Sequence, residues 1–252
     1  MNQRIERVRA AMQAQGLTQM IVSDPKSVWY LTGVEVEPYE RLLALYLPVC
    51  GEPVLFLNRL FNVPDPPCQA MWYDDVQDPV AQIAGVVDAA ATLGIDKDWP
   101  AKFLIPLMQH CSGMRVVLAS DCVDDCRACK DEAEQTLMRE ASRINDEVNA
   151  AVKQYVRVGM TEKQVARFVD EQYLAHGCEG NSFTTIVSFG ANAADPHHEP
   201  DNTVLQPGQC VLVDMGCRKN RYCSDMTRTW FAGTPTEKQA AVHELVHRAN
   251  LA

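Results

Sequence analysis

The stretch Val211–Trp230 decides the fold and reads VLVDMGCRKNRYCSDMTRTW. Two runs rich in β-branched and aromatic residues flank a polar centre, a pattern that predicts a β-hairpin. With the turn centred on Lys219 and Asn220, Asp214 and Asp225 are expected directly opposite each other, with Cβ atoms about 4.5–5.5 Å apart. Because facing like charges destabilise a sheet, the pair requires a cation or a shared proton. Two carboxylates at that separation can bridge one or two divalent metal ions.

The alternative for this pair is a solvated hairpin face with two ordinary surface aspartates. Side chains alternate between the two faces of a strand, so the neighbours of the pair can be read from the sequence. Those expected on its face are small or weakly polar: Leu212, Gly216, Cys223, Thr227 and Thr229. No lysine or arginine stands among them, so we interpret this face as the floor of a site.

Composition limits the classes of function. The 252 residues are 47% hydrophobic, enough for a substantial core, and carry a net charge of −10 with a pI of about 5.1. An acidic chain without a basic patch is not expected to bind nucleic acid or an anionic membrane. No apolar run approaches the roughly 18 residues of a membrane span, and no apolar segment follows the charged N-terminus as in a secretory signal. We therefore expect a cytoplasmic protein.

The spacing of cysteines and histidines in the sequence indicates no metal site besides the hairpin. The ten cysteines are expected to stay reduced rather than to form a disulfide framework. Cys122, Cys126 and Cys129 lack the additional ligands of a zinc knuckle. His243 and His247 have the i, i+4 spacing of a metal-binding helix, but we expect no metal site there either.

Helix and strand patterns divide the chain into two parts. Helices are predicted for residues 4–15, 79–93, 131–158 and 161–176, and strands for 20–22, 42–49, 53–57, 94–95 and 182–190. Residues 121–129 read as a connector between an α/β part and a second part. A final helix is expected to start at a Thr-x-x-Glu capping box formed by Thr234 and Glu237, and to continue to the end of the sequence.

The loop of residues 191–200 is the second candidate functional segment. It contains the adjacent histidines His197 and His198, framed by Pro196 and Pro200. Two histidines in such a loop are poorly explained by core packing. A solvated loop remains the alternative, although loops carry functional residues disproportionately.

Several of these stretches together resemble the creatinase/aminopeptidase P/prolidase family of pita-bread metallopeptidases. The resemblance rests on Asp24-Pro25 with Tyr30-Leu31-Thr32-Gly33, on Cys129 to Glu134, on Phe189 to His198, and on the two aspartate motifs of the hairpin, Val213 to Gly216 and Ser224 to Thr229. It implies an α/β N-terminal creatinase-like domain (residues 1–125) followed by an incomplete α+β pita-bread catalytic domain (residues 126–252).

The resemblance also implies roles for individual residues. Asp214 and Asp225 would bind two divalent metal ions (manganese, cobalt or zinc), and Thr227 would hydrogen-bond to this metal site without touching the ions. His197 would be catalytic and contact the substrate, a peptide containing proline, and His198 would line the same pocket. The implied activity is that of an Xaa-Pro peptidase, and the implied assembly is a homodimer.

The family completes its metal site with a histidine and two glutamates that follow the hairpin, and this sequence ends at Ala252 without them. We therefore expect a truncated chain with little or no activity. Two other functions stay open on the same fold: a metal-free, creatinase-like amidinohydrolase, and a non-catalytic binding module. Fold-level analogy alone does not choose among them.

Overall fold

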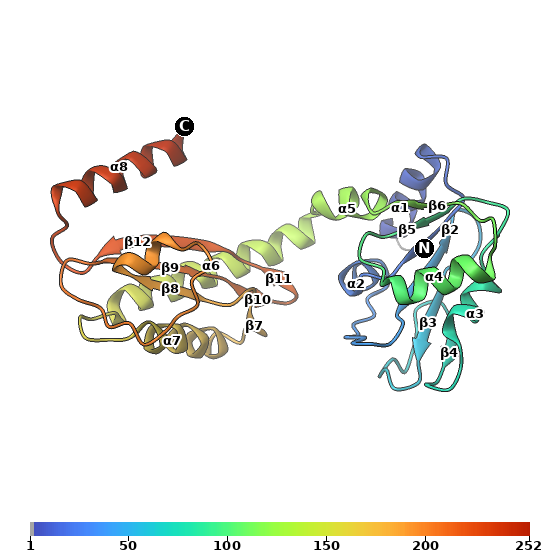
Figure 1. Cartoon of the computed structure of the whole chain (residues 1–252), viewed down its shortest axis with the longest axis horizontal. Helices are drawn as coiled ribbons and strands as arrows, with labels where there is room; N and C mark the ends of the chain where they lie inside the picture. Colours follow the sequence, from blue (N-terminus) through green and yellow to red (C-terminus); the bar gives the residue numbers. More distant parts are fainter. Residues whose placement is uncertain (1–2) are drawn as a thin grey trace. The chain divides into compact units, whose positions relative to one another are not determined.

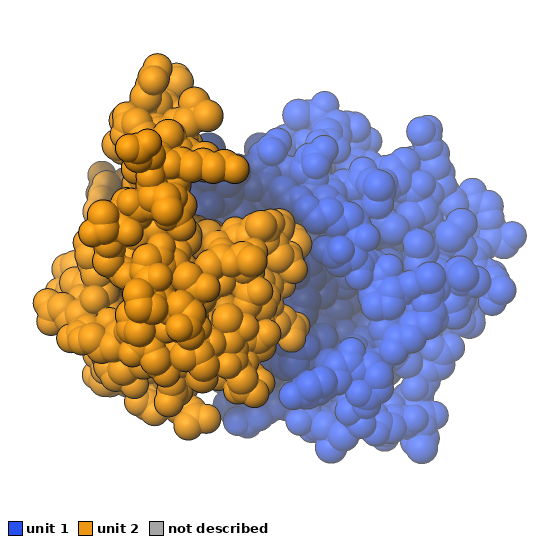
Figure 2. Space-filling view, turned by 60° about the vertical axis from the view of Figure 1, so that its left-hand side comes forward, with its two compact units in different colours: residues 1–130 blue, residues 131–252 orange. Residues whose placement is uncertain are grey.

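The chain forms two compact units. The computed structural model describes residues 3–252, and the first unit ends at Lys130 while the second begins at Asp131 (Figures 1 and 2). Each unit has its own hydrophobic core.

The first unit is built on a six-stranded mixed sheet with the order β4-β3-β2-β1-β5-β6. Its strands are β1 (Gln19–Val22), β2 (Ala44–Pro48), β3 (Val54–Asn58), β4 (Gln69–Tyr73), β5 (Leu93–Ile95) and β6 (Val116–Leu118). Its helices are α1 (Gln3–Ala14), α2 (Pro25–Thr32), α3 (Pro79–Ala84), α4 (Ala101–His110) and α5 (Asp121–Ala128).

Helices cover both faces of this sheet, because side chains alternate along each strand. Met20 and Val22 of β1 belong to the cluster that contains residues of α1, α2 and α5. Ile21, between them, belongs to the cluster that contains residues of α3 and α4. The first unit is therefore a three-layer α/β sandwich (Figure 1), which agrees with the predicted α/β class.

Two sequence predictions in this unit were wrong. The helix expected over 79–93 ends at Ala84, and the chain turns before it enters β5. The turn is held by Gln19, whose side chain accepts from the Asp88 amide and donates to the Asp88 carbonyl. The expected connector at 121–129 is instead helix α5, whose Cys122, Val123 and Cys126 are buried in the core of the first unit.

The second unit packs helices against two small antiparallel sheets. Its helices are α6 (Glu132–Tyr155), α7 (Glu162–Ala175) and α8 (Glu237–Leu251), with a 3₁₀ helix η1 (Gly190–Ala194). Its strands are β7 (Gly180–Asn181), β8 (Ile186–Phe189), β9 (Cys210–Met215), β10 (Cys217–Lys219), β11 (Tyr222–Cys223) and β12 (Met226–Phe231). The sheets have the orders β12-β9-β8 and β11-β10-β7.

One face of this strand array is buried against α6 and α7. Val211, Val213, Met215 and Cys217 alternate along β9 and β10 and share a core with apolar residues of the two helices. The helices begin at the predicted positions, since Asp131 and Thr161 form capping boxes with Glu134 and Gln164. Asp214 and Asp225 lie on the opposite face of the array, away from α6 and α7.

The last helix begins two residues later than predicted. Thr236 caps α8, and its side chain exchanges hydrogen bonds with Gln239, so the capping box is not Thr234 with Glu237. The residue at the first helical position is Glu237, and Pro235 precedes the cap.

Two chain-wide features bear on the setting of the protein. In the described part of the chain, no helix is both long and apolar enough to cross a membrane. All ten cysteines are free thiols. The cytoplasmic location stays a prediction.

Candidate metal and peptide site

The hairpin forms, but its register differs from the predicted one. Asp214 faces Thr227, and Lys219 faces Tyr222, so the turn is centred on Asn220 and Arg221. Both turn residues have positive φ, 48° and 69°. A two-residue type I′ turn requires positive φ at both central positions and favours asparagine at the first. The expectation that the two aspartates face each other directly was therefore wrong.

The corrected register still keeps the carboxylates on one face. The pairing of β9 with β12 continues into that of β10 with β11 without a bulge. In this register Asp225 lies two positions from Thr227, the residue opposite Asp214, so Asp225 is the diagonal neighbour of Asp214. Diagonal neighbours lie about 7–8 Å apart, a separation that side chains still span. Opposite Asp225 stands Gly216, where an added Cβ would lie only 2.0 Å from the Ser224 carbonyl oxygen. The chain is therefore closely packed beside the pair.

The environment of the two aspartates differs. Asp214 is half-buried, and its Oδ1 accepts a hydrogen bond of 2.7 Å from the Thr227 hydroxyl. Asp225 is exposed. Neither carboxylate forms an ion pair with a lysine, arginine or histidine within residues 3–252. The carboxylates of this face are thus free to bind a cation from solution.

A buried side-chain pair braces the strand that carries Asp214. Asn145 of α6 is fully buried and donates a 3.1 Å hydrogen bond to the carbonyl of Met215, the residue after Asp214. Its side-chain oxygen accepts from the Tyr173 hydroxyl of α7. Burial raises the pKa of Tyr173 above its ordinary value, so the phenol remains a hydrogen-bond donor. Both helices therefore hold β9 in position.

Glu162 organises the loop that contains the two histidines. Its side chain is 0% exposed and lies at the start of α7. One oxygen accepts from the Phe189 amide at 2.7 Å and the Asn192 side chain at 3.0 Å. The other accepts from the Asp201 amide at 3.1 Å and lies 2.7 Å from Nε2 of His198. A single buried carboxylate thus joins both ends of the loop.

The two predicted histidines have different surroundings. His198 is mostly buried, with 14% of its side chain exposed, and its Nε2 is occupied by Glu162. His197 is exposed, and its backbone amide donates to the Asp195 side chain at 2.9 Å. The loop is therefore anchored through His198 and leaves the ring of His197 accessible.

Glu162, His198 and Asp201 also have ligand atoms close enough together to hold a metal ion. A carboxylate offers about four lone-pair sites, and those of Glu162 already receive four hydrogen bonds. A metal here would have to displace the contacts that shape the loop. We therefore interpret the group as a structural clamp.

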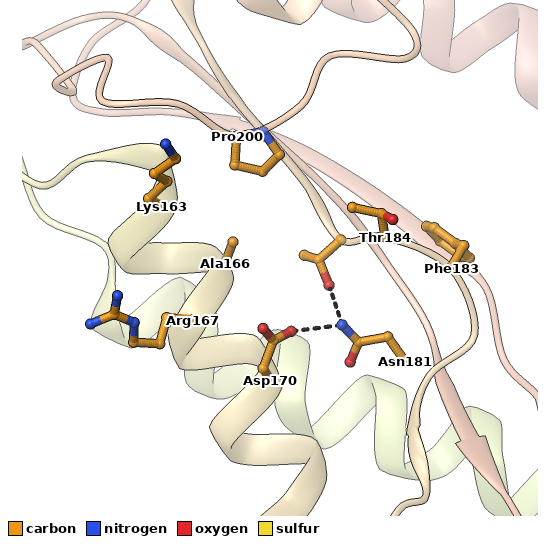
Figure 3. A pocket seen from close by; sticks show the side chains of 9 residues that line it. Lys163, Ala166, Arg167, Asp170, Asn181, Phe183, Thr184 and Pro200 are labelled. Carbon is orange, nitrogen blue, oxygen red and sulfur yellow. Dashed lines mark hydrogen bonds between the residues drawn. The ribbon is translucent and has the colours of Figure 1, made fainter.

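A pocket of about 590 Å³ lies between α7 and the segment before β8 (Figure 3). It is lined by Lys163, Ala166, Arg167, Asp170, Asn181, Phe183, Thr184, Thr185 and Pro200. Asn181 donates to Asp170 at 2.6 Å and to Thr185 at 3.2 Å on its floor. None of the predicted site residues lines it.

The sequence placed Glu162 only in the first turn of the helix predicted over 161–176, and the role of its side chain was missed. The signal was weak, since a glutamate in the first turn of a helix is ordinary. What distinguishes Glu162 is contact with residues 27 to 39 positions away, which no local pattern reveals.

The chain matches known proteins along its length. Residues 4–129 match the creatinase/prolidase N-terminal domain, and residues 136–252 match metallopeptidase family M24. A curated relative from Mycobacterium tuberculosis, named probable dipeptidase PepE, is 32% identical over 99% of this chain and 68% of its own length.

Solved structures agree. Recombinant prolidase from Thermococcus sibiricus superposes with a TM-score of 0.91 at 26% identity, covering 98% of this chain and 70% of that one. Dipeptidase PepE from Mycobacterium ulcerans gives a TM-score of 0.87 at 32% identity, covering 94% and 66%. These matches confirm the predicted creatinase-like domain followed by a pita-bread domain. The chain belongs to the metallopeptidase family M24, and the relatives and solved structures that it matches here are named as dipeptidases and a prolidase.

Proposed function

We propose that this chain carries the carboxylate part of a dinuclear metal site in an Xaa-Pro dipeptidase, with Asp214 and Asp225 as ligands of manganese, cobalt or zinc. The observation that carries the proposal is two carboxylates on one hairpin face, with no cationic side chain of residues 3–252 paired to either. The substrate would be a short peptide containing proline. The names of the relatives, prolidase and dipeptidase, support this class over a longer-chain aminopeptidase.

The residues fit divalent ions. Carboxylate oxygens are hard ligands suited to manganese and also found on zinc. The hydroxyl of Thr227 occupies one position on Asp214 and thereby orients that carboxylate, while Asp225 is accessible from solvent. When bound, such ions act as Lewis acids and make water a nucleophile at neutral pH.

The histidine loop would act on the peptide. The exposed imidazole of His197 can donate a hydrogen bond or a proton to the substrate near neutral pH. In His198, Nε2 is engaged by Glu162, so Nδ1 is the ring atom available for the predicted substrate contact. We assign to His198 the additional task of positioning the loop.

Two carboxylates alone leave a metal largely hydrated and weakly held. We therefore propose that these 252 residues bind manganese weakly and hydrolyse Xaa-Pro dipeptides slowly or not at all. A homodimer stays a prediction.

Manganese titration and dipeptide hydrolysis test the proposal together. Manganese binding should be lost in Asp225→Asn and retained in Asp146→Asn, which removes an exposed aspartate from α6. Equal manganese binding by both variants would show that Asp225 of the hairpin is not a metal ligand. Rapid hydrolysis that survives Asp225→Asn would indicate catalysis without this pair, as in a metal-free amidinohydrolase. Metal binding without turnover, at any manganese concentration, would agree with an incomplete ligand set.

A further inference from the structure

Helix α8 contains a complete motif that the hairpin site does not use. Residues 243–247 read His-Glu-Leu-Val-His, the His-Glu-x-x-His pattern in which two histidines one turn apart bind zinc. The helix spans Glu237–Leu251 and is closed at its start by the Thr236 capping box. The helical context that this motif requires is therefore present.

The two histidines lie on the polar side of the helix. At 100° per residue, His243 and His247 are about 40° apart, and they point away from the apolar stripe formed by Ala241, Val242, Leu245, Val246 and Ala249. All of these residues are exposed in the structure. If another surface covered the stripe, the imidazoles would still face solvent.

Their geometry suits a chelate. Residues four apart on a helix have Cβ atoms about 5–6 Å apart, and zinc binds imidazole nitrogen at about 2.0–2.1 Å. The ring of His243 packs edge-on against Phe231, with centroids 5.9 Å apart, which restricts its orientation. Neither imidazole has a hydrogen bond or ion pair within residues 3–252. Both are thus available as ligands.

The ligand count distinguishes this helix from a catalytic zinc centre. A catalytic site has three protein ligands, and the described residues supply no third histidine, cysteine or carboxylate grouped with this pair. Imidazoles favour zinc, copper and nickel, whereas the aspartates of the hairpin are hard oxygen ligands. We propose that His243 and His247 form a second, two-histidine metal site on α8 for a borderline transition metal ion, with zinc as its representative, completed by water. This proposal differs from the expectation, drawn from the sequence, that no metal binds there.

Zinc titration of the chain, monitored by calorimetry, tests the proposal. One zinc ion should bind in addition to any at the hairpin, and His243→Asn or His247→Asn should weaken that binding by about tenfold or more, since even the loss of a supporting group costs 10–100-fold in metal affinity. His110→Asn is the matched control, because it removes a single partly exposed histidine from α4 in the first unit.

A crossed comparison separates the two sites. Asp225→Asn should leave zinc binding to α8 intact, and His247→Asn should leave manganese binding to the hairpin intact. Zinc binding that is equal in the parent chain and in the His243→Asn, His247→Asn double variant would overturn the proposal. Circular dichroism of that double variant confirms that α8 and the rest of the fold persist.

Discussion

Replacing Glu162 by alanine should loosen the histidine loop and destabilise the second unit. The carboxylate is fully buried. It forms four hydrogen bonds: with the backbone amides of Phe189 and Asp201, with the side-chain amide of Asn192 and with Nε2 of His198. Removing one partner of a buried, charged cluster costs about 3–5 kcal/mol, because the remaining groups lose their partners inside the protein. For a chain of this size, that lowers the unfolding midpoint by roughly 6–20 °C.

The Gln variant provides a graded test at the same position. Its amide oxygen can still accept hydrogen bonds from Phe189 and Asn192. Its NH₂ group, however, would face the backbone N–H of Asp201, which is also a donor. We therefore expect a smaller loss for Glu162→Gln, about 1–3 kcal/mol.

Differential scanning calorimetry measures both losses, and hydrogen exchange of the Phe189 and Asp201 amides reports on the loop itself. Glu171→Ala is the control, since Glu171 is an exposed glutamate on the same helix and should change stability by less than about 0.5 kcal/mol. A loss below 1 kcal/mol for Glu162→Ala, about a third of the smallest value expected for a buried pair, or unchanged protection of both amides would refute the clamp.

Three further results are expected. Gly216→Ala should destabilise the hairpin by about 3 kcal/mol in urea unfolding, since its new methyl group would lie 2.0 Å from a backbone oxygen. The control Gly85→Ala, whose new methyl group would have its nearest contact at 3.4 Å, should be nearly neutral. Similar losses for the two variants would contradict the close packing at Gly216. Asn145→Leu should cost about 2–5 kcal/mol, because two buried hydrogen-bonding groups lose their partner, and a neutral result would rule out the brace. Hydrogen bonds from the side chain and the backbone amide of Thr203 lower the pKa of Asp201. The Asp201 carboxylate therefore stabilises the fold at pH values above its unfolded pKa, and this stabilisation is lost as the pH falls through its lowered pKa in the folded protein. Thr203→Val should raise the pKa of Asp201 measured by carboxyl NMR, and an unchanged pKa would contradict this cause.

Local patterns in the sequence predicted much of this architecture. The starts of α6 and α7 were predicted correctly, and in the structure both are fixed by capping boxes, because the residues that satisfy the first helical amides lie within one turn. The run of β-branched residues before the polar centre predicted β9, whose residues alternate between buried and partly buried in the structure. The hairpin motifs and the Asp24-Pro25 stretch identified the family, which the comparisons confirmed.

Other features depended on contacts between distant segments. The turn on Asn220 and Arg221 shifted the pairing of Asp214 by two positions, a choice made by backbone conformation rather than by composition. Helix α5 looked like an acidic connector, yet its buried side belongs to the core of the first unit.

The sequence by itself determined the family, the two-part organisation and the presence of Asp214 and Asp225 on one hairpin face, because those follow from motifs and from period-two alternation. Only the tertiary structure decided which residue faces each aspartate and that Glu162 binds the histidine loop. Both are properties of segments that are distant in sequence, and a buried charge selects its partners from whichever donors the fold brings near it.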